Sequence, residues 1–154
     1  MKGILLLFLF FSLLFTAKGQ TIRATGGGWS NSIAATTITT TGNNYSQNVT
    51  SGISQTFIDI SPTTINWIVR INKMDTHWHN SLELYAKRVG NGFLTTATIS
   101  GGTIFSIIQN TPVEFFRGTY SITSIPIQYE IRGLSVLIPA DSYSTTIYYT
   151  ISDN

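Results

Sequence analysis

Apolar and polar residues alternate with a period of two in several short stretches of the chain, and this period is typical of strands. The clearest stretches are 125–132, where isoleucines and a tyrosine alternate with polar residues, and 143–151, where odd positions hold tyrosine, threonine or isoleucine. A third strand is expected over 67–71, with Trp67 on its apolar side. Because proline lacks an amide donor, the strand that contains Pro126 is expected at a sheet edge or to begin there.

Shorter strands are expected between turn signals. Leu82, Leu84 and Ala86 alternate with polar residues, and the Gly-Asn-Gly sequence at 90–92 predicts a hairpin whose returning arm is 93–99. A loop is expected over 74–80. The remaining expected strands are 33–40, 54–60, 103–108 and 113–116.

These elements predict an all-β fold. Threonine, serine and isoleucine are abundant after residue 20, and no stretch there shows a sustained helical period. β-Branched and aromatic side chains suit a pleated, half-buried surface. Short strands separated by turn signals favour a single antiparallel β-sandwich of about eight strands over an open α/β sheet.

The first nineteen residues differ from the rest and have the layout of a secretory signal peptide. Lys2 gives a short positive segment, 4–15 is apolar except for Ser12, and small residues at 17 and 19 suit a signal peptidase. The apolar run is shorter than the roughly 20 residues that a transmembrane span needs. We therefore expect cleavage after Gly19, export to the periplasm, cell surface or medium, and no membrane insertion afterwards.

Composition narrows the class of the exported chain. The precursor has nine basic and seven acidic residues and no cysteine. Loss of Lys2 and Lys18 with the signal leaves seven of each sign, so no electrostatic field attracts nucleic acid or anionic lipid. An exported domain without disulfides fits a bacterial protein better than a small animal secreted domain. The expected parts are a signal peptide (1–19), a flexible glycine-rich lead-in (20–31) and a β-sandwich (32–154).

No pattern indicates catalysis. The chain has neither a G-x-S-x-G elbow nor an H-E-x-x-H helix, and its two histidines lie close together at 77 and 79. A glycosidase needs two carboxylates across a cleft. The carboxylates of Asp59, Glu83, Glu114 and Glu130 are instead expected to be solvated surface charges. The sequence predicts a non-enzymatic protein without a cofactor.

Two groups of side chains are candidate sites. Asp75, His77 and His79 are spaced by two residues, so in an extended segment they would share one side and suit a divalent metal. The alternative is a polar loop with solvated histidines. Trp29 and Trp78 fall in expected loops, where they are candidates for stacking on sugar rings, together with the two histidines.

The end of the chain resembles a known group. Its last thirty residues read Ile127-Gln-Tyr-Glu-Ile-Arg-Gly, then Ile138-Pro-Ala-Asp-Ser-Tyr-Ser-Thr-Thr-Ile-Tyr-Tyr-Thr. This segment resembles the end of bacterial spore-coat-protein-U and fimbrial-subunit-like domains. The resemblance implies an immunoglobulin-like or fimbrial-like exported sandwich. The cysteines common in such subunits are missing here, and Gly26–Gly28 interrupts the lead-in where a long donor strand would lie.

The leading hypothesis is therefore a structural or adhesive role at the bacterial cell surface, with a partner or a second copy joined through a strand edge. The strand 126–132 and the last strand are the expected edges. The contacts expected in the last strand are Tyr143, Thr145, Ile147, Tyr149 and Ile151. The alternative hypothesis is a secreted module that binds a glycan or small ligand through Trp29, Trp78, His77 and His79.

Overall fold

The computed structural model describes residues 19–33, 48–62 and 65–154. Nearly all of the expected signal peptide, and all but Ile33 of the strand expected over 33–40, lie outside these residues. The described part consists of ten strands and contains no helix. The prediction of an all-β chain is therefore confirmed for this part, with ten strands in place of about eight.

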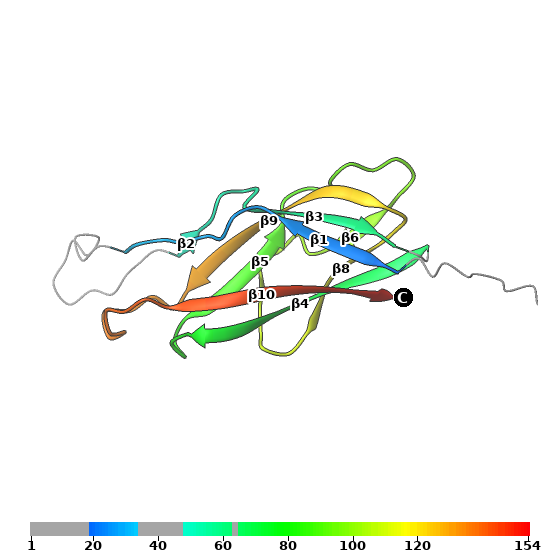
Figure 1. Ribbon diagram of the computed structural model, residues 1–154. Helices are drawn as coiled ribbons and strands as arrows, with labels where there is room; N and C mark the ends of the chain where they lie inside the picture. The colour runs from blue at the N-terminus through cyan, green and yellow to red at the C-terminus, as the bar shows by residue number, and fades with distance from the viewer. Residues whose placement is uncertain (1–18, 34–47, 63–64) are drawn as a thin grey trace, which may run out of the picture.

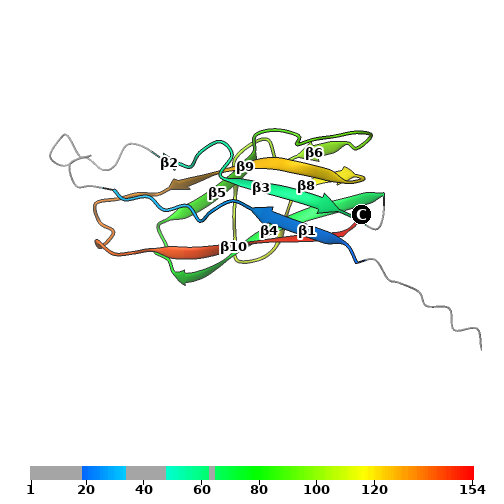
Figure 2. The ribbon, with the colours of Figure 1, turned by 45° about the horizontal axis from the view of Figure 1, so that its top comes forward.

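The strands form two antiparallel sheets that lie in two layers (Figures 1 and 2). The larger sheet has the order β1-β3-β9-β5-β7, and β2 also pairs with β9. Its strands are β1 (Thr21–Thr25), β2 (Val49–Thr50), β3 (Thr56–Ser61), β5 (Glu83–Arg88), β7 (Ser106–Ile107) and β9 (Ile122–Arg132). The smaller sheet has the order β10-β4-β8-β6. Its strands are β4 (Asn66–His77), β6 (Ile99–Gly101), β8 (Val113–Thr119) and β10 (Ser144–Asp153).

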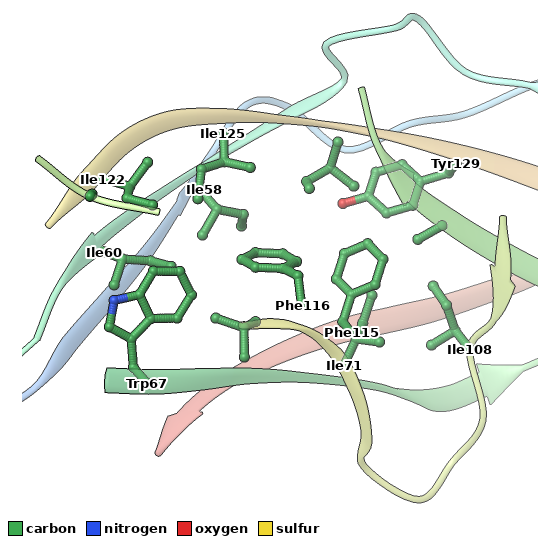
Figure 3. Packing of buried hydrophobic residues seen from close by; sticks show 14 of the residues in the cluster. Ile58, Ile60, Trp67, Ile71, Ile108, Phe115, Phe116, Ile122, Ile125 and Tyr129 are labelled. Atoms are coloured by element: carbon green, nitrogen blue, oxygen red, sulfur yellow. The ribbon is translucent and has the colours of Figure 1, made fainter. Parts of the chain in front are cut away.

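The core lies between the layers, where the period of two places alternate side chains (Figure 3). Trp67 of β4 is completely buried and meets Phe116 of β8 edge to face, with ring centroids 6.1 Å apart. Ile58 and Ile60 of β3 cover this pair from the other sheet (Figure 3). Burying one such side chain stabilises the fold by about 1.5–3 kcal/mol. The predicted apolar sides of the strands at 67–71 and 82–86 are confirmed as core.

The prediction that Pro126 marks a sheet edge is wrong. β9 lies in the middle of the larger sheet, between β3 and β5. Pro126 is tolerated there because β5 ends at Arg88, one residue short of it. The Pro126 carbonyl accepts the Val89 amide at 2.8 Å, and the ring nitrogen faces the same side, where the chain leaves the strand.

The predicted hairpin over 82–99 is also wrong. Both sides of β5 are occupied, one by β9 and the other by β7, so no returning arm can pair with it. Gly92, with a φ of +71°, turns the chain toward β9, where the Phe93 amide donates to the Thr123 carbonyl at 2.7 Å. The chain then crosses to the smaller sheet, and β6 pairs with β8.

Two segments expected to be irregular are strands. β4 continues through the expected loop as far as His77, because β10 pairs with it over that whole length. At the other end of the chain, Thr21–Thr25 forms β1 against β3. β1 ends at Thr25, and Gly26 follows with a φ of +122°; a Cβ there would lie 2.5 Å from the Gln55 carbonyl oxygen, so no side chain fits.

Candidate functional site

One edge strand of this sandwich, β10, is longer than its other edge strands. β10 has ten residues and, among the residues that the structure describes, pairs with β4 alone, so its other side is an open sheet edge (Figure 1). In the described ranges the other strands that pair on one side only are β1, β2, β6 and β7, with five, two, three and two residues. Natural sheets commonly blunt an edge by keeping its strand short. β10 is not blunted in this way. The prediction that the last strand lies at an edge is confirmed.

The backbone groups of β10 point alternately toward β4 and toward the open edge. The amide of Asn154, just after β10, donates to the carbonyl of Asn66 just opposite it, at 3.4 Å. The Lys73 amide donates to the Gln109 carbonyl at 2.8 Å on the far side of β4, although Lys73 lies opposite Ile147. Bonded and non-bonded pairs alternate in an antiparallel ladder. Odd-numbered residues of β10 therefore turn their amides and carbonyls outward.

These outward backbone groups belong to Thr145, Ile147, Tyr149 and Ile151. No backbone group in the part of the chain that the structure describes hydrogen-bonds to them. β1 runs beside β10, where Gln20 hydrogen-bonds to Asp153, but all five residues of β1 pair with β3. The strand therefore presents unpaired donors and acceptors along most of its length.

The side chains of β10 separate into two faces. Thr145, Ile147, Tyr149 and Ile151 are half-buried, and the last three pack against the core. Four of the five predicted edge contacts thus face inward with their side chains and reach the edge with their backbone. The outer face carries Ser144, Thr146, Tyr148 and Thr150, all exposed. No charged residue occurs between 142 and 152.

A pair of phenols fixes β10 against the larger sheet. The hydroxyls of Tyr149 and Tyr129 are 2.8 Å apart, and the Tyr129 hydroxyl also donates to Thr56 Oγ1 at 2.9 Å. Burial raises the pKa of Tyr149 well above the usual value, and the neighbouring Tyr129 raises it further. Burial likewise raises the pKa of Tyr129. Both hydroxyls are therefore held in the neutral form across the physiological range.

Tyr143, the fifth predicted contact, precedes β10 and belongs to a partly exposed aromatic cluster. Its ring centroid lies 5.5 Å from that of His77 and 5.9 Å from that of His79, and its hydroxyl donates to the Pro139 carbonyl. His77 Nε2 is 3.2 Å from a carboxylate oxygen of Asp141. This cluster locks the start of β10 onto the end of β4.

The metal site expected at Asp75, His77 and His79 is not formed. Asp75 accepts a hydrogen bond from Lys73 Nζ at 2.6 Å, and His79 Nδ1 accepts the Ser81 amide. Burial tends to raise the pKa of Asp75, but hydrogen bonds from Lys73 and Thr145 outweigh it and lower the pKa. Within the described ranges, no three histidines or carboxylates come close enough to hold a metal ion.

The tryptophans expected to be loop platforms are partly withdrawn from solvent. Trp29 and Trp78 are half-buried and pack against the core. The Trp78 indole donates to the Leu82 carbonyl at 2.8 Å, and Lys73 Nζ lies 5.4 Å from its ring centroid. Trp78 does adjoin the histidines in sequence, but its ring packs against the core.

A shallow, open hollow lies next to β10 on the smaller sheet. The residues that line it are Asn72, Lys73, Met74, Asn110, Tyr148 and Thr150. Met74 and Tyr148 are exposed, and the two asparagines add amide groups. No local sequence pattern indicates this hollow, because it joins residues of β4, β10 and the loop before β8.

Arg88 is a buried charged residue that was not among the predicted site residues. Its side chain is buried, and it donates to the carbonyls of Gly101 and Gly90 and to Asn91 Oδ1. Burial lowers the pKa of its guanidinium. The signal was available, because the alternation that buries Leu82, Leu84 and Ala86 continues to this position. Arg88 holds the segment that crosses between the sheets.

The four carboxylates expected to be solvated all have partners. Asp59 accepts the Ser124 amide at 2.8 Å, Glu83 the Tyr85 hydroxyl and Glu114 the Arg117 guanidinium. Glu130 differs from the expectation, because it is buried and bonded to Arg132 and Asn48. No two of these four form a pair with each other.

No family model, no curated protein and no solved structure matches the chain. Its function has to be inferred from its own strands and side chains. Among the residues that the structure describes, no helix has the length and apolar character needed to cross a membrane.

Proposed function

We propose that this protein is an exported, non-enzymatic β-sandwich with a structural or adhesive role at the bacterial cell surface, and that it joins its partner by adding a strand to the edge of β10. The expected signal peptide and the resemblance of the last thirty residues to spore-coat-protein-U and fimbrial-subunit-like domains support the compartment and the role. The single observation that carries the proposal is the open, ten-residue edge of β10.

The chemistry of β10 supports strand addition. An open edge acts as a template because its amides and carbonyls can pair with another extended chain. Natural proteins discourage such pairing with lysine, proline or inward charges, and β10 contains none of them before Asp153. Its threonine, tyrosine and isoleucine residues have high β-propensity. The only irregularity in the pairing of β10 with β4 is the bulge at Ser144–Thr145, at the beginning of β10.

The test is fractionation of cells that make the full chain. We expect the wild-type protein on the surface or in high-mass material. Tyr148→Lys puts a charge on the outer face of the edge strand and is expected to release the protein as a soluble monomer. Met74→Lys is the matched control, because it adds the same charge to an exposed position of β4 that lies opposite Thr146 of β10 and not at the open edge.

The proposal would be contradicted if wild-type protein were soluble and monomeric at high concentration with no surface attachment. It would be equally contradicted if Tyr148→Lys and Met74→Lys behaved alike, since the effect would then belong to charge and not to the edge.

A saccharide-binding role is the second candidate, and the hollow beside β10 favours it. Tyr148 offers an aromatic ring there, while Asn72 and Asn110 offer amides, a combination that suits neutral sugars. This role would be favoured if Tyr148→Ala lost glycan-array binding while the variant still attached to the cell surface. Loss in Trp78→Ala alone would instead favour the loop aromatics.

A further inference from the structure

We propose that the partner at the β10 edge is a second copy of this chain, paired antiparallel about a two-fold axis that passes through Tyr148. This inference rests on the proposed function, and it specifies the occupant and the register. In the resulting dimer, the two four-stranded sheets join through β10 and its copy into one sheet of eight strands.

The register follows from which backbone groups are free. The outward residues between the bulge at Ser144–Thr145 and the Asp153 contact with Gln20 are Thr145, Ile147, Tyr149 and Ile151. An antiparallel copy uses all four only when it is centred on the position midway between them, which is Tyr148. Centring the axis one residue earlier or later leaves at least one of the four outside this regular segment.

The side chains are complementary in this register. On the inner side, Ile147 lies opposite Tyr149 of the copy, and Thr145 lies opposite Ile151. On the outer side, Tyr148 meets its own copy, while Thr146 lies opposite Thr150. Aromatic, β-branched and threonine pairs each stabilise a ladder by roughly 0.2–1 kcal/mol, and like charges directly opposite would destabilise it. No like charges meet, because the segment has no charged residue.

A second copy fits better than an unrelated strand because a two-fold pairing must be self-complementary. The segment from Thr145 to Ile151 is nearly symmetric in character about Tyr148, with β-branched or aromatic residues on both sides. A different protein that adds a strand to this edge is the competing outcome of the test.

The absence of cysteine from the chain makes single-cysteine variants a direct probe of this register. Even-numbered residues of β10 form non-bonded pairs with the copy, where opposed Cα atoms are about 4.5 Å apart. This distance suits a disulfide. In Tyr148→Cys, exported by cells that make the full chain, mild oxidation is expected to cross-link two copies.

Thr146→Cys and Thr150→Cys are the matched controls on the same exposed face. Each lies about 13 Å from its own copy in this register, which is too far for a disulfide. Each alone is expected to cross-link several-fold less than Tyr148→Cys. A mixture of the two variants is expected to cross-link well, because position 146 of one copy faces position 150 of the other.

The outcomes separate this inference from the proposed function. Equal cross-linking by all three single variants, or strong cross-linking by Thr146→Cys alone, overturns the register. No cross-linking, in protein that still assembles and that Tyr148→Lys releases, overturns the second copy as partner but leaves the edge as the binding site. No cross-linking and no assembly overturn both. Tyr148→Phe, which keeps the ring, should assemble like wild type and shows that the position tolerates change.

Discussion

Burial decides the chemistry of single residues in this protein. Alternation with a period of two correctly places Trp67 and its neighbours in the core, because a strand sends successive side chains to opposite faces. The same rule places Arg88 inside, although its charge suggests the surface. Residue identity alone could not show which carbonyls Arg88 would meet, because Gly90 and Gly101 come to it only in the folded chain. The metal prediction at 75–79 failed for a related reason, since Lys73 and Asp141 take up two of the three side chains.

Replacing Arg88 should destabilise the fold strongly. Arg88→Met keeps much of the length of the side chain but removes the buried guanidinium that donates to the carbonyls of Gly90 and Gly101 and to Asn91 Oδ1. Hydrogen bonds from a charged group contribute about 1.5–3 kcal/mol, so we expect a loss of roughly 2–4 kcal/mol in the free energy of unfolding. Urea denaturation measures it. Arg117→Met, at an exposed ion pair with Glu114, should cost less than about 1 kcal/mol. Equal losses in the two variants would contradict the role of Arg88.

The phenol pair predicts a stability loss at alkaline pH. The pKa values of Tyr129 and Tyr149 are raised in the folded protein, so the folded state holds these protons more tightly than the unfolded chain does. The contribution of these two protonated hydroxyls to the free energy of unfolding is complete below the unfolded tyrosine pKa of about 10. It is lost as pH rises above that value.

Tyr149→Phe tests this directly through thermal unfolding at several pH values. At neutral pH it should cost about 1 kcal/mol, the usual net value of one hydrogen bond. Above pH 10 its melting temperature should fall less steeply than that of wild type. Tyr148→Phe, which removes an exposed hydroxyl, should follow the wild-type curve. A parallel fall in Tyr149→Phe would show that other groups control the alkaline transition.

At the scale of the strand, the sequence predicts where a strand occurs better than it predicts which strands pair with it. The last strand and the strand over 67–71 were both found from their alternation, and β10 does lie at an edge. Which strands pair depends on contacts between distant residues, and these leave no local pattern. Pro126 in the sequence favours an edge position for β9, yet β3 and β5 flank this strand. The proline is tolerated there because β5 ends before it. The hairpin expected after residue 90 is absent because β9 and β7 already pair with β5.

The pairing of β4 with β8 predicts a sensitive glycine. A Cβ on Gly118 would lie 2.4 Å from the Thr98 carbonyl oxygen and 2.5 Å from Cζ2 of Trp67, which is completely buried. Gly118→Ala should therefore cost about 1–3 kcal/mol, the usual range for overpacking a core. Chemical denaturation of this variant and of Gly27→Ala, where a Cβ meets nothing within 4 Å, provides the comparison. Little loss in Gly118→Ala would mean that the Trp67 ring can move aside.

At the scale of the whole molecule, the two sheets, as far as the described residues go, leave one long edge strand and four short ones. A protein without disulfides has to hold its core by burial and ladder hydrogen bonds, and both are present here. Burial and pairing within one molecule do not account for the open edge of β10. The proposed strand addition would account for it, because the free groups would then complete a ladder.

The most direct measurement is residue-resolved amide hydrogen exchange of the protein at low and at high concentration. In dilute solution the outward amides of Ile147, Tyr149 and Ile151 should exchange quickly, and those of Thr146, Tyr148 and Thr150, which face β4, should exchange slowly. At high concentration the outward amides should slow several-fold while the others stay unchanged. Outward amides that exchange at the same rate at every concentration would contradict assembly through β10.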